Sequence, residues 1–155
     1  MPARPSESFG RDLDGACILV IDDEAGVRSI VRRMLRDCRC RVVEATDGFE
    51  GLATVEREAV VDLVLTDLSM PRIGGLAVLE SLGRRRPEIP VIVMSGNSAA
   101  MNGMPQVPVL RKPFTADELL ALITDLLTRV RPAALPAVPP SVRPAARSRY
   151  RAPPL

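Results

Sequence analysis

Residues 16–24 of the chain read ACILVIDDE, an unbroken apolar run that ends in three acids. Such a run is typical of a central parallel strand that is covered by helices on both faces. In α/β folds, ligands bind at the carboxyl ends of the strands, near the point where the strand order switches. The stretch therefore predicts a buried strand whose exit carries acidic side chains into a candidate site.

Apolar runs and helical patterns alternate along the residues that follow. Strands are expected at 41–44, 61–66, 91–94 and 107–110, and helices at 27–35, 47–57, 75–84 and from 115 onward. Thr115 and Glu118 form a capping box that opens the last helix. The apolar helix positions assigned to the core include Ile30, Phe49, Leu52, Ala53, Val55 and Leu76. Strands alternating with single helices predict an α/β fold with a parallel sheet between two helical layers.

The end of the 155-residue chain differs in composition from its body. Residues 131–155 hold seven prolines and five arginines but no acid, so with a net charge of +2 overall, residues 1–130 carry −3. A segment with so little large apolar surface cannot offset its ordering entropy. We therefore expect a flexible lead over 1–14, one folded domain over 15–130 and a disordered Pro/Ala/Arg-rich tail over 131–155.

Several functional classes are excluded by what the chain lacks. It contains no histidine, which removes His-based hydrolases, most zinc sites and a phosphohistidine carrier. No apolar run approaches the roughly 18 residues of a membrane helix, and the N-terminus has no signal-peptide pattern, so we expect a cytoplasmic protein without membrane contact. The three cysteines are expected to stay reduced, with Cys17 in the core and Cys38 and Cys40 at a helix end.

Chemically active side chains follow four of the expected strands. They are Asp22, Asp23 and Glu24 after the first, Asp67 after the third, Ser95 after the fourth and Lys112 after the fifth. Clustered carboxylates repel one another, and their hard oxygens suit Mg²⁺. A lysine and a hydroxyl nearby would neutralise and hydrogen-bond a phosphoryl group, and an aspartate so flanked can form an acyl phosphate.

A purely structural interpretation of these residues stays open at this point. The acids of residues 22–24 also suit the N-terminus of the first helix, where carboxylates stabilise unpaired amides. Lys112 is also compatible with a solvated loop position. It is, however, the only lysine among 21 basic residues, which favours a specific need for a compact ammonium.

Four segments, ILVIDDE, LVLTDLSMP, VIVMSG and VLRKPF, resemble the receiver domain of two-component response regulators over roughly residues 16–130. The resemblance implies a flavodoxin-like, doubly wound, five-stranded parallel sheet with strand order 2-1-3-4-5. It also implies that Asp67 is the phosphoacceptor. By the same resemblance, Mg²⁺ would be bound by Asp23 directly, by Asp22 through water, by Asp67 and by the backbone carbonyl of Ser69.

The resemblance assigns two further residues and shows two departures. Ser95 and Lys112 match the hydroxyl and lysine that contact the phosphoryl group, and the Lys112–Pro113 bond would be cis. The interval from Ser95 to Lys112 is shorter than in other receivers, which predicts a shortened or degenerate fourth helix. Val109 stands where receivers have Tyr or Phe. We therefore expect phosphorylation to be retained and the output mechanism to differ.

These inferences describe a stand-alone receiver that takes a phosphoryl group from a histidine kinase or a phosphotransfer protein and signals by protein contact. Its only chemistry would be Mg²⁺-dependent self-phosphorylation and self-dephosphorylation. The alternatives are an interaction module that is not phosphorylated and a phosphate sink with atypical output. An aspartate-nucleophile phosphatase would need an acid where Ser69 stands. Specific nucleic-acid binding is not expected, and dimerisation, the cognate kinase and the target stay open.

Overall fold

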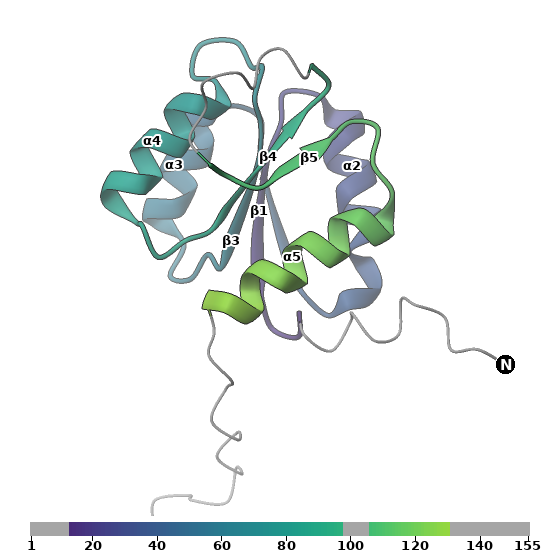
Figure 1. The fold of residues 1–155 in the computed structure, drawn as a ribbon. Coiled ribbons are helices and arrows are strands. Elements are labelled where there is room, and N and C mark those ends of the chain that lie inside the picture. Colours follow the sequence, from purple (N-terminus) through teal and green to yellow (C-terminus); the bar gives the residue numbers. More distant parts are fainter. Residues whose placement is uncertain (1–12, 98–105, 131–155) are drawn as a thin grey trace, which may run out of the picture.

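The fold is a five-stranded parallel sheet between two layers of helices (Figure 1). The computed structural model describes residues 13–97 and 106–130. Its strands are β1 (Cys17–Ile21), β2 (Arg41–Ala45), β3 (Leu63–Asp67), β4 (Val91–Ser95) and β5 (Val109–Arg111). Its helices are α2 (Ala25–Met34), the 3₁₀ helix η1 (Arg36–Cys38), α3 (Gly48–Arg57), α4 (Gly75–Arg85) and α5 (Ala116–Val130). The order β2-β1-β3-β4-β5 confirms the predicted doubly wound sheet.

The two faces of the sheet carry separate hydrophobic clusters. Helices α2 and α5 cover one face, and α3 and α4 cover the other (Figure 1). All five residues of β1 are buried. Ile18 and Val20 belong to the cluster on the α2 and α5 side, whereas Leu19 and Ile21 belong to the opposite cluster. This alternation is the period of two expected for a strand covered on both faces, so β1 is the centre of the core.

Helix α3 buries Val55 and partly buries Leu52, as predicted, but the two other residues assigned to the core face solvent. Phe49 is 69% exposed and Ala53 is also exposed, while Gly48, Gly51, Thr54 and Val55 are buried. A Cβ on Gly51 would lie 2.3 Å from the Ile21 side chain, so the helix packs against β1 through its glycine side. Ile30 and Leu76 likewise lie on the solvent sides of α2 and α4.

The last helix begins as predicted and fixes the loop before it. The Thr115 N–H donates to Glu118 Oε2 at 2.8 Å, and the Glu118 N–H donates to Thr115 Oγ1 at 3.2 Å. This reciprocal pair is the predicted capping box. Four residues of α5 are then buried against the sheet, namely Leu119, Leu120, Ile123 and Leu127. The start of α5 is thereby set just after the loop that holds Lys112.

Some boundaries differ from the sequence prediction. β3 begins at Leu63 and not at 61, and β5 covers Val109–Arg111 and not 107–110, where Pro108 has no N–H to donate. Leu13 was assigned to the flexible lead but is fully buried, and its carbonyl accepts from the Ala16 N–H at 2.9 Å. The packed part of the chain therefore includes residue 13.

Three predictions fall on residues that the structure does not describe. The predicted short helix between β4 and β5 falls mostly on residues 98–105. The predicted flexible lead falls mostly on residues 1–12, and the predicted disordered tail falls on residues 131–155. Within the described ranges, none of the helices has both the length and the apolar character needed to cross a bilayer.

Candidate functional site

Three carboxylates gather at the carboxyl ends of two neighbouring strands. Asp22 follows β1 directly, Asp23 comes next, and Asp67 is the last residue of β3. Oxygen atoms of these three side chains lie within 4.8 Å of one another. Because parallel strands end at the same edge of a sheet, the pairing of β1 with β3 places these acids together, as the sequence predicted.

Asp22 is held in place from both its side chain and its backbone. It is fully buried, and its Oδ1 accepts from the Glu24 N–H at 2.9 Å. Arg28 of α2 donates Nη1 to the Asp22 carbonyl at 2.7 Å. Glu24 is the N-cap of α2, but its side chain makes no capping hydrogen bond. Among the acids of residues 22–24, the structure therefore shows one side-chain bond at the start of α2, in which Asp22 accepts from the Glu24 amide, while the other oxygen of Asp22 contacts Lys112.

Lys112 joins the two buried carboxylates. Its Nζ lies 2.9 Å from Asp22 Oδ2 and 3.0 Å from Asp67 Oδ1. The Lys112 backbone N–H donates to the Ser95 carbonyl at 2.9 Å, which fixes the loop after β5 to the end of β4. The Lys112–Pro113 bond is cis, as the resemblance implied. The ammonium is thus aimed into the acidic cluster and is not a solvated loop charge.

Burial and neighbouring charges shift the pKa values of Asp67 and Lys112. Burial raises the pKa of Asp67, the Lys112 ammonium opposes this, and the charges of Asp22 and Asp23 add to the rise. For Lys112, burial by itself lowers the pKa, but hydrogen bonds and charges from Asp22 and Asp67 together raise it above its ordinary value. Lys112 therefore stays an ammonium at neutral pH, while Asp67 sits in an environment that disfavours its negative charge.

The donor set fits a hard divalent cation. Three carboxyl groups and one ammonium make up the cluster, and every ligand atom that the carboxyl groups offer is an oxygen. Mg²⁺ prefers such oxygens, binds through a few carboxylates and keeps several waters. Asp23 is exposed, which leaves one side of the cluster open to solvent. Asp22, Asp23 and Asp67 are therefore the residues that would hold a magnesium ion.

Two predicted site residues form no hydrogen bond with the carboxylates among the described residues. Ser95 is buried at the end of β4, but its hydroxyl donates to the Asn97 carbonyl at 3.0 Å and accepts from the Asn97 N–H at 3.1 Å. Ser69 is exposed in the loop between β3 and α4. Ser95 lies at the correct edge of the sheet but is engaged within its own turn, and the roles of both serines stay predictions.

Gly75 supports the site and was missed as a site-shaping residue. It is the first residue of α4, and a Cβ there would lie 2.2 Å from the Asp67 carbonyl oxygen. The Gly75 N–H also donates to the Leu68 carbonyl at 3.2 Å. The loop after β3 thus folds back onto Asp67 in a way that only glycine permits. The adjacent pair Gly74 and Gly75 ahead of a helix was the available signal.

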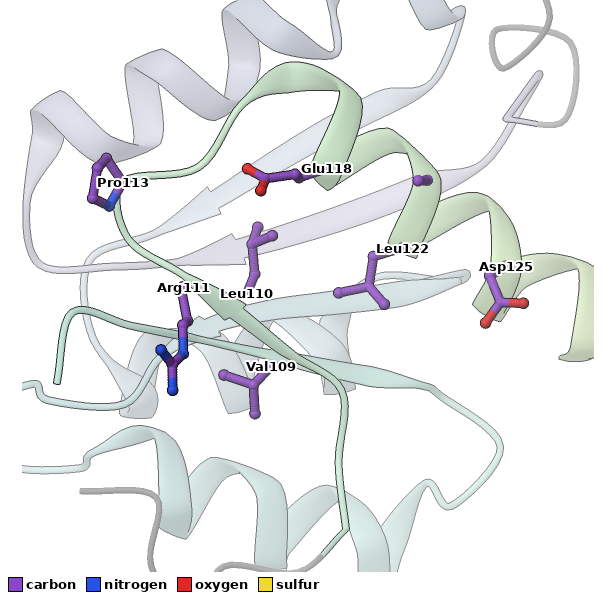
Figure 2. A pocket seen from close by; sticks show the side chains of 8 residues that line it. Val109, Leu110, Arg111, Pro113, Glu118, Leu122 and Asp125 are labelled. Carbon is purple, nitrogen blue, oxygen red and sulfur yellow. The ribbon is translucent and has the colours of Figure 1, made fainter. Parts of the chain in front are cut away.

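The surface beside Lys112 contains the predicted departure at Val109. Side chains of β5 and α5 line a pocket of about 520 Å³, with Val109, Arg111 and Leu122 around it (Figure 2). Val109 is half-buried, and none of the side chains lining this pocket is aromatic. The site chemistry is therefore combined with a β5 surface that lacks the aromatic group expected of receivers.

Comparison with known proteins agrees with this geometry. The family model for the response regulator receiver domain matches residues 18–124. The response regulator MprA of Mycobacterium leprae is 36% identical over 120 residues, which are 74% of this chain and 52% of MprA. The DNA-binding transcriptional regulator NtrC of Salmonella typhimurium is 33% identical over 111 residues, covering 68% of this chain and 24% of NtrC. The chain thus spans about half, or less, of the length of these relatives.

Two solved structures match this chain over nearly the whole of their own length. A response regulator receiver domain protein from Clostridium thermocellum has a TM-score of 0.65 and 31% identity, covering 74% of this chain and 95% of its own. The response regulator TrrA of Thermotoga maritima, in complex with Mg²⁺ and BeF, has a TM-score of 0.66 and 26% identity, covering 72% and 98%. Together with the family match over most of the described fold, these similarities show that the chain belongs to the response regulator receiver domain family.

Proposed function

We propose that the chain accepts a phosphoryl group on Asp67 with Mg²⁺ held by Asp22, Asp23 and Asp67. The observation that carries the proposal is the position of Lys112 Nζ, between Asp22 and Asp67 in a cluster of three carboxylates. Receiver domains of this family interact with histidine kinases or phosphotransfer proteins, so the donor would be a phosphohistidine. The complex of TrrA with Mg²⁺ and BeF supports both the ion and the acceptor site.

The two oxygens of Asp67 have different surroundings, which suggests which one reacts. Oδ1 is held by Lys112, whereas within residues 13–97 and 106–130 no group donates a hydrogen bond to Oδ2. Oδ2 would attack the phosphorus of the donor phosphohistidine, and the phosphorus–nitrogen bond would break. The bonding pair would pass to the imidazole nitrogen, which takes up a proton as it leaves. The product would be an acyl phosphate on Asp67 and a neutral histidine on the donor.

The surrounding residues would lower the electrostatic cost of this transfer. A phosphoryl group brings negative oxygens towards three carboxylates, so without positive charge the approach is repulsive. Lys112 would turn one or more of its N–H groups to those oxygens while remaining beside Asp22. Bound Mg²⁺ would supply the remaining positive charge at the phosphoryl oxygens. Release of the phosphoryl group to water would reset Asp67, giving the self-dephosphorylation expected of a receiver.

Ser95 and Ser69 would complete the site after small local changes. The Ser95 hydroxyl would exchange its partner in the Asn97 turn for a phosphoryl oxygen, since both lie at the same edge of the sheet. The Ser69 carbonyl would bind the ion from the loop after β3. We further propose that the reaction takes place in the cytoplasm and that output passes through protein contact. The alternative of a phosphate sink would share the same chemistry.

The test is amide NMR of the full chain titrated with beryllofluoride in the presence and absence of Mg²⁺. The proposal predicts shifts at Asp67, Leu68, Ser95 and Lys112 only when both reagents are present. Asp67→Asn, which keeps the shape of the side chain, is expected to abolish them. Equal shifts in Asp67→Asn, or none in the natural sequence, would contradict the proposal and favour an interaction module that is not phosphorylated.

A further inference from the structure

A second surface feature lies beside the outer strand β2, away from the carboxylate cluster. Here α2, η1 and β2 enclose a hollow of about 410 Å³, which we call the α2–β2 groove. Its lining combines three arginines with apolar or neutral side chains, namely Arg32, Arg33 and Arg36 with Leu35, Cys40 and Val42. It is formed by the C-terminal part of α2, by η1 and by the start of β2, whereas the carboxylate cluster lies at the carboxyl ends of β1 and β3.

The groove has an excess of positive charge. Arg33 and Arg36 are exposed, and neither forms an ion pair within the part of the chain that the structure describes. Arg32 Nη1 lies 2.8 Å from Glu44 Oε1, and Arg28 Nε lies 3.4 Å from Glu44 Oε2. One carboxylate is therefore shared by two arginines, and two further guanidinium groups lie free at the rim. A guanidinium of this kind binds carboxylates in a bidentate geometry.

Among the described residues, the outer side of β2 has backbone N–H and C=O groups that pair with no other strand. β2 is the outer strand of the sheet and pairs with β1. The Arg41 N–H donates to the Ala16 carbonyl, and the Ala45 carbonyl accepts from the Asp22 N–H. Since the direction of these groups alternates along a strand, the N–H and C=O groups of Val42 and Glu44 face outward. An edge of this kind is a template for an added strand.

We propose that the α2–β2 groove binds an acidic, extended segment of a partner protein, which adds to the edge of β2 and sets its carboxylates against Arg33 and Arg36. Alternate side chains of a strand are about 6.8 Å apart. Arg33 near the end of α2 and Arg36 at the start of η1 are three positions apart in the sequence, and their long side chains reach over this spacing.

The two observations together favour a peptide over a nucleic acid. A nucleic acid would use the positive charges but would leave the outward N–H and C=O groups of β2 without partners. An extended acidic peptide uses both the charges and the outward N–H and C=O groups of β2. The proposal does not depend on phosphorylation of Asp67, because the groove and the carboxylate cluster lie at opposite ends of the strands.

Fluorescence anisotropy of the full chain with a labelled peptide of alternating glutamate and valine tests the charge contribution. Arg33→Glu and Arg36→Glu are each expected to weaken binding by about tenfold or more. Arg84→Glu is the matched control, because Arg84 is exposed on α4 and has no ion pair among the described residues. The proposal would be overturned if Arg84→Glu weakened binding equally or if neither groove variant had an effect. It would also be overturned if the peptide did not bind at all. The first two results would show that the peptide is attracted by the positive charge of the whole chain, including the arginines of residues 131–155.

A second pair of peptides tests the addition to β2. One carries N-methyl groups on its odd-numbered amides and the other on its even-numbered amides, so each blocks one edge of the extended peptide. The proposal predicts that one version loses most of its affinity while the other keeps it, and equal affinities would overturn strand addition. A single-stranded oligonucleotide that binds more tightly than the peptide, with the same dependence on Arg33 and Arg36, would identify a phosphate site and overturn the peptide assignment.

Discussion

The ammonium of Lys112 lies 3.0 Å from Asp67 Oδ1, although 45 positions separate the two residues in the sequence. The contact depends on the order of the strands, because β4 lies between β3 and β5 and the loop after β5 crosses the end of β4. The hydrogen bond from the Lys112 N–H to the Ser95 carbonyl holds that loop in place. One lysine thereby offsets one of three carboxylate charges.

Removal of this ammonium is expected to destabilise the fold. In Lys112→Ala, Asp22 stays fully buried without its ion-pair partner, so we expect the free energy of unfolding to fall by about 2 kcal/mol. Urea unfolding followed by circular dichroism measures the loss. Arg111→Ala is the control, because Arg111 is its exposed neighbour and forms no ion pair within the described residues. Equal losses in the two variants would show that the ammonium does not matter.

Two glycines of the same helix are expected to respond in opposite directions to alanine. Gly75→Ala would force a Cβ to 2.2 Å from the Asp67 carbonyl, and we expect a loss of about 2–4 kcal/mol. Gly83→Ala places its Cβ in open space, so we expect a gain of about 0.5–1 kcal/mol from helix propensity. Thermal unfolding measures both, and a neutral Gly75→Ala would show that the loop after β3 is not tightly fitted to Asp67.

Glu50 is expected to give the fold a pH dependence in the acidic range. Its Oε2 accepts hydrogen bonds from the Thr46 N–H and Thr46 Oγ1, both at 2.7 Å, and these lower its pKa. A carboxyl with a lowered pKa in the folded state stabilises above its unfolded pKa, near 4.3, and this stability is lost as the pH falls through the lower folded value. Because Glu50 is exposed, we expect Glu50→Gln to cost only about 0.5 kcal/mol at neutral pH.

The measurement is the difference in urea midpoint between Glu50→Gln and the natural sequence at neutral pH and at pH 3. The difference is expected to shrink at the lower pH, because protonation of Glu50 leaves it uncharged like glutamine. Glu80→Gln is the control, because Glu80 is exposed on α4 and forms no ion pair within the described ranges. A difference that is the same at both pH values would rule out a contribution from the ionised carboxylate.

The three thiols are expected to react slowly while the chain is folded. Burial raises the pKa of Cys17 and of Cys38, and it raises the pKa of Cys40 to about 11. At pH 8 the thiolate fraction of Cys40 is then about a hundredfold below that of a free cysteine. Reaction with a disulfide reagent, counted as thiols per chain, is expected to be slow until urea unfolds the protein. Fast labelling of the folded chain would contradict this.

Sequence patterns predict the sheet well because its strands are decided by local residues. The apolar run at 16–21 identified β1, and the acids that follow it identified the edge that carries the site. The order of strands needed the resemblance to receivers, since no local pattern determines which strand lies beside which. The pairing of β1 with β3 then brings Asp22 and Asp67 together.

The errors arose where contacts across space decide the outcome. Phe49 was assigned to the core by its apolarity, but the close approach of Gly51 to Ile21 turns the opposite face of α3 inward. Leu13 was assigned to a flexible lead because nothing in its neighbourhood resembles an element, yet it packs in the core beside α5.

The measurement that tests the central claim most directly is the intact mass of the full chain after incubation with acetyl phosphate and Mg²⁺. The account predicts that the natural sequence gains the mass of one phosphoryl group, that Asp67→Asn gains none, and that removal of Mg²⁺ by a chelator prevents the gain. A chain that stays unmodified with Mg²⁺ present, or an Asp67→Asn variant that is modified to the same extent, would contradict the assignment of Asp67 as the phosphoryl acceptor.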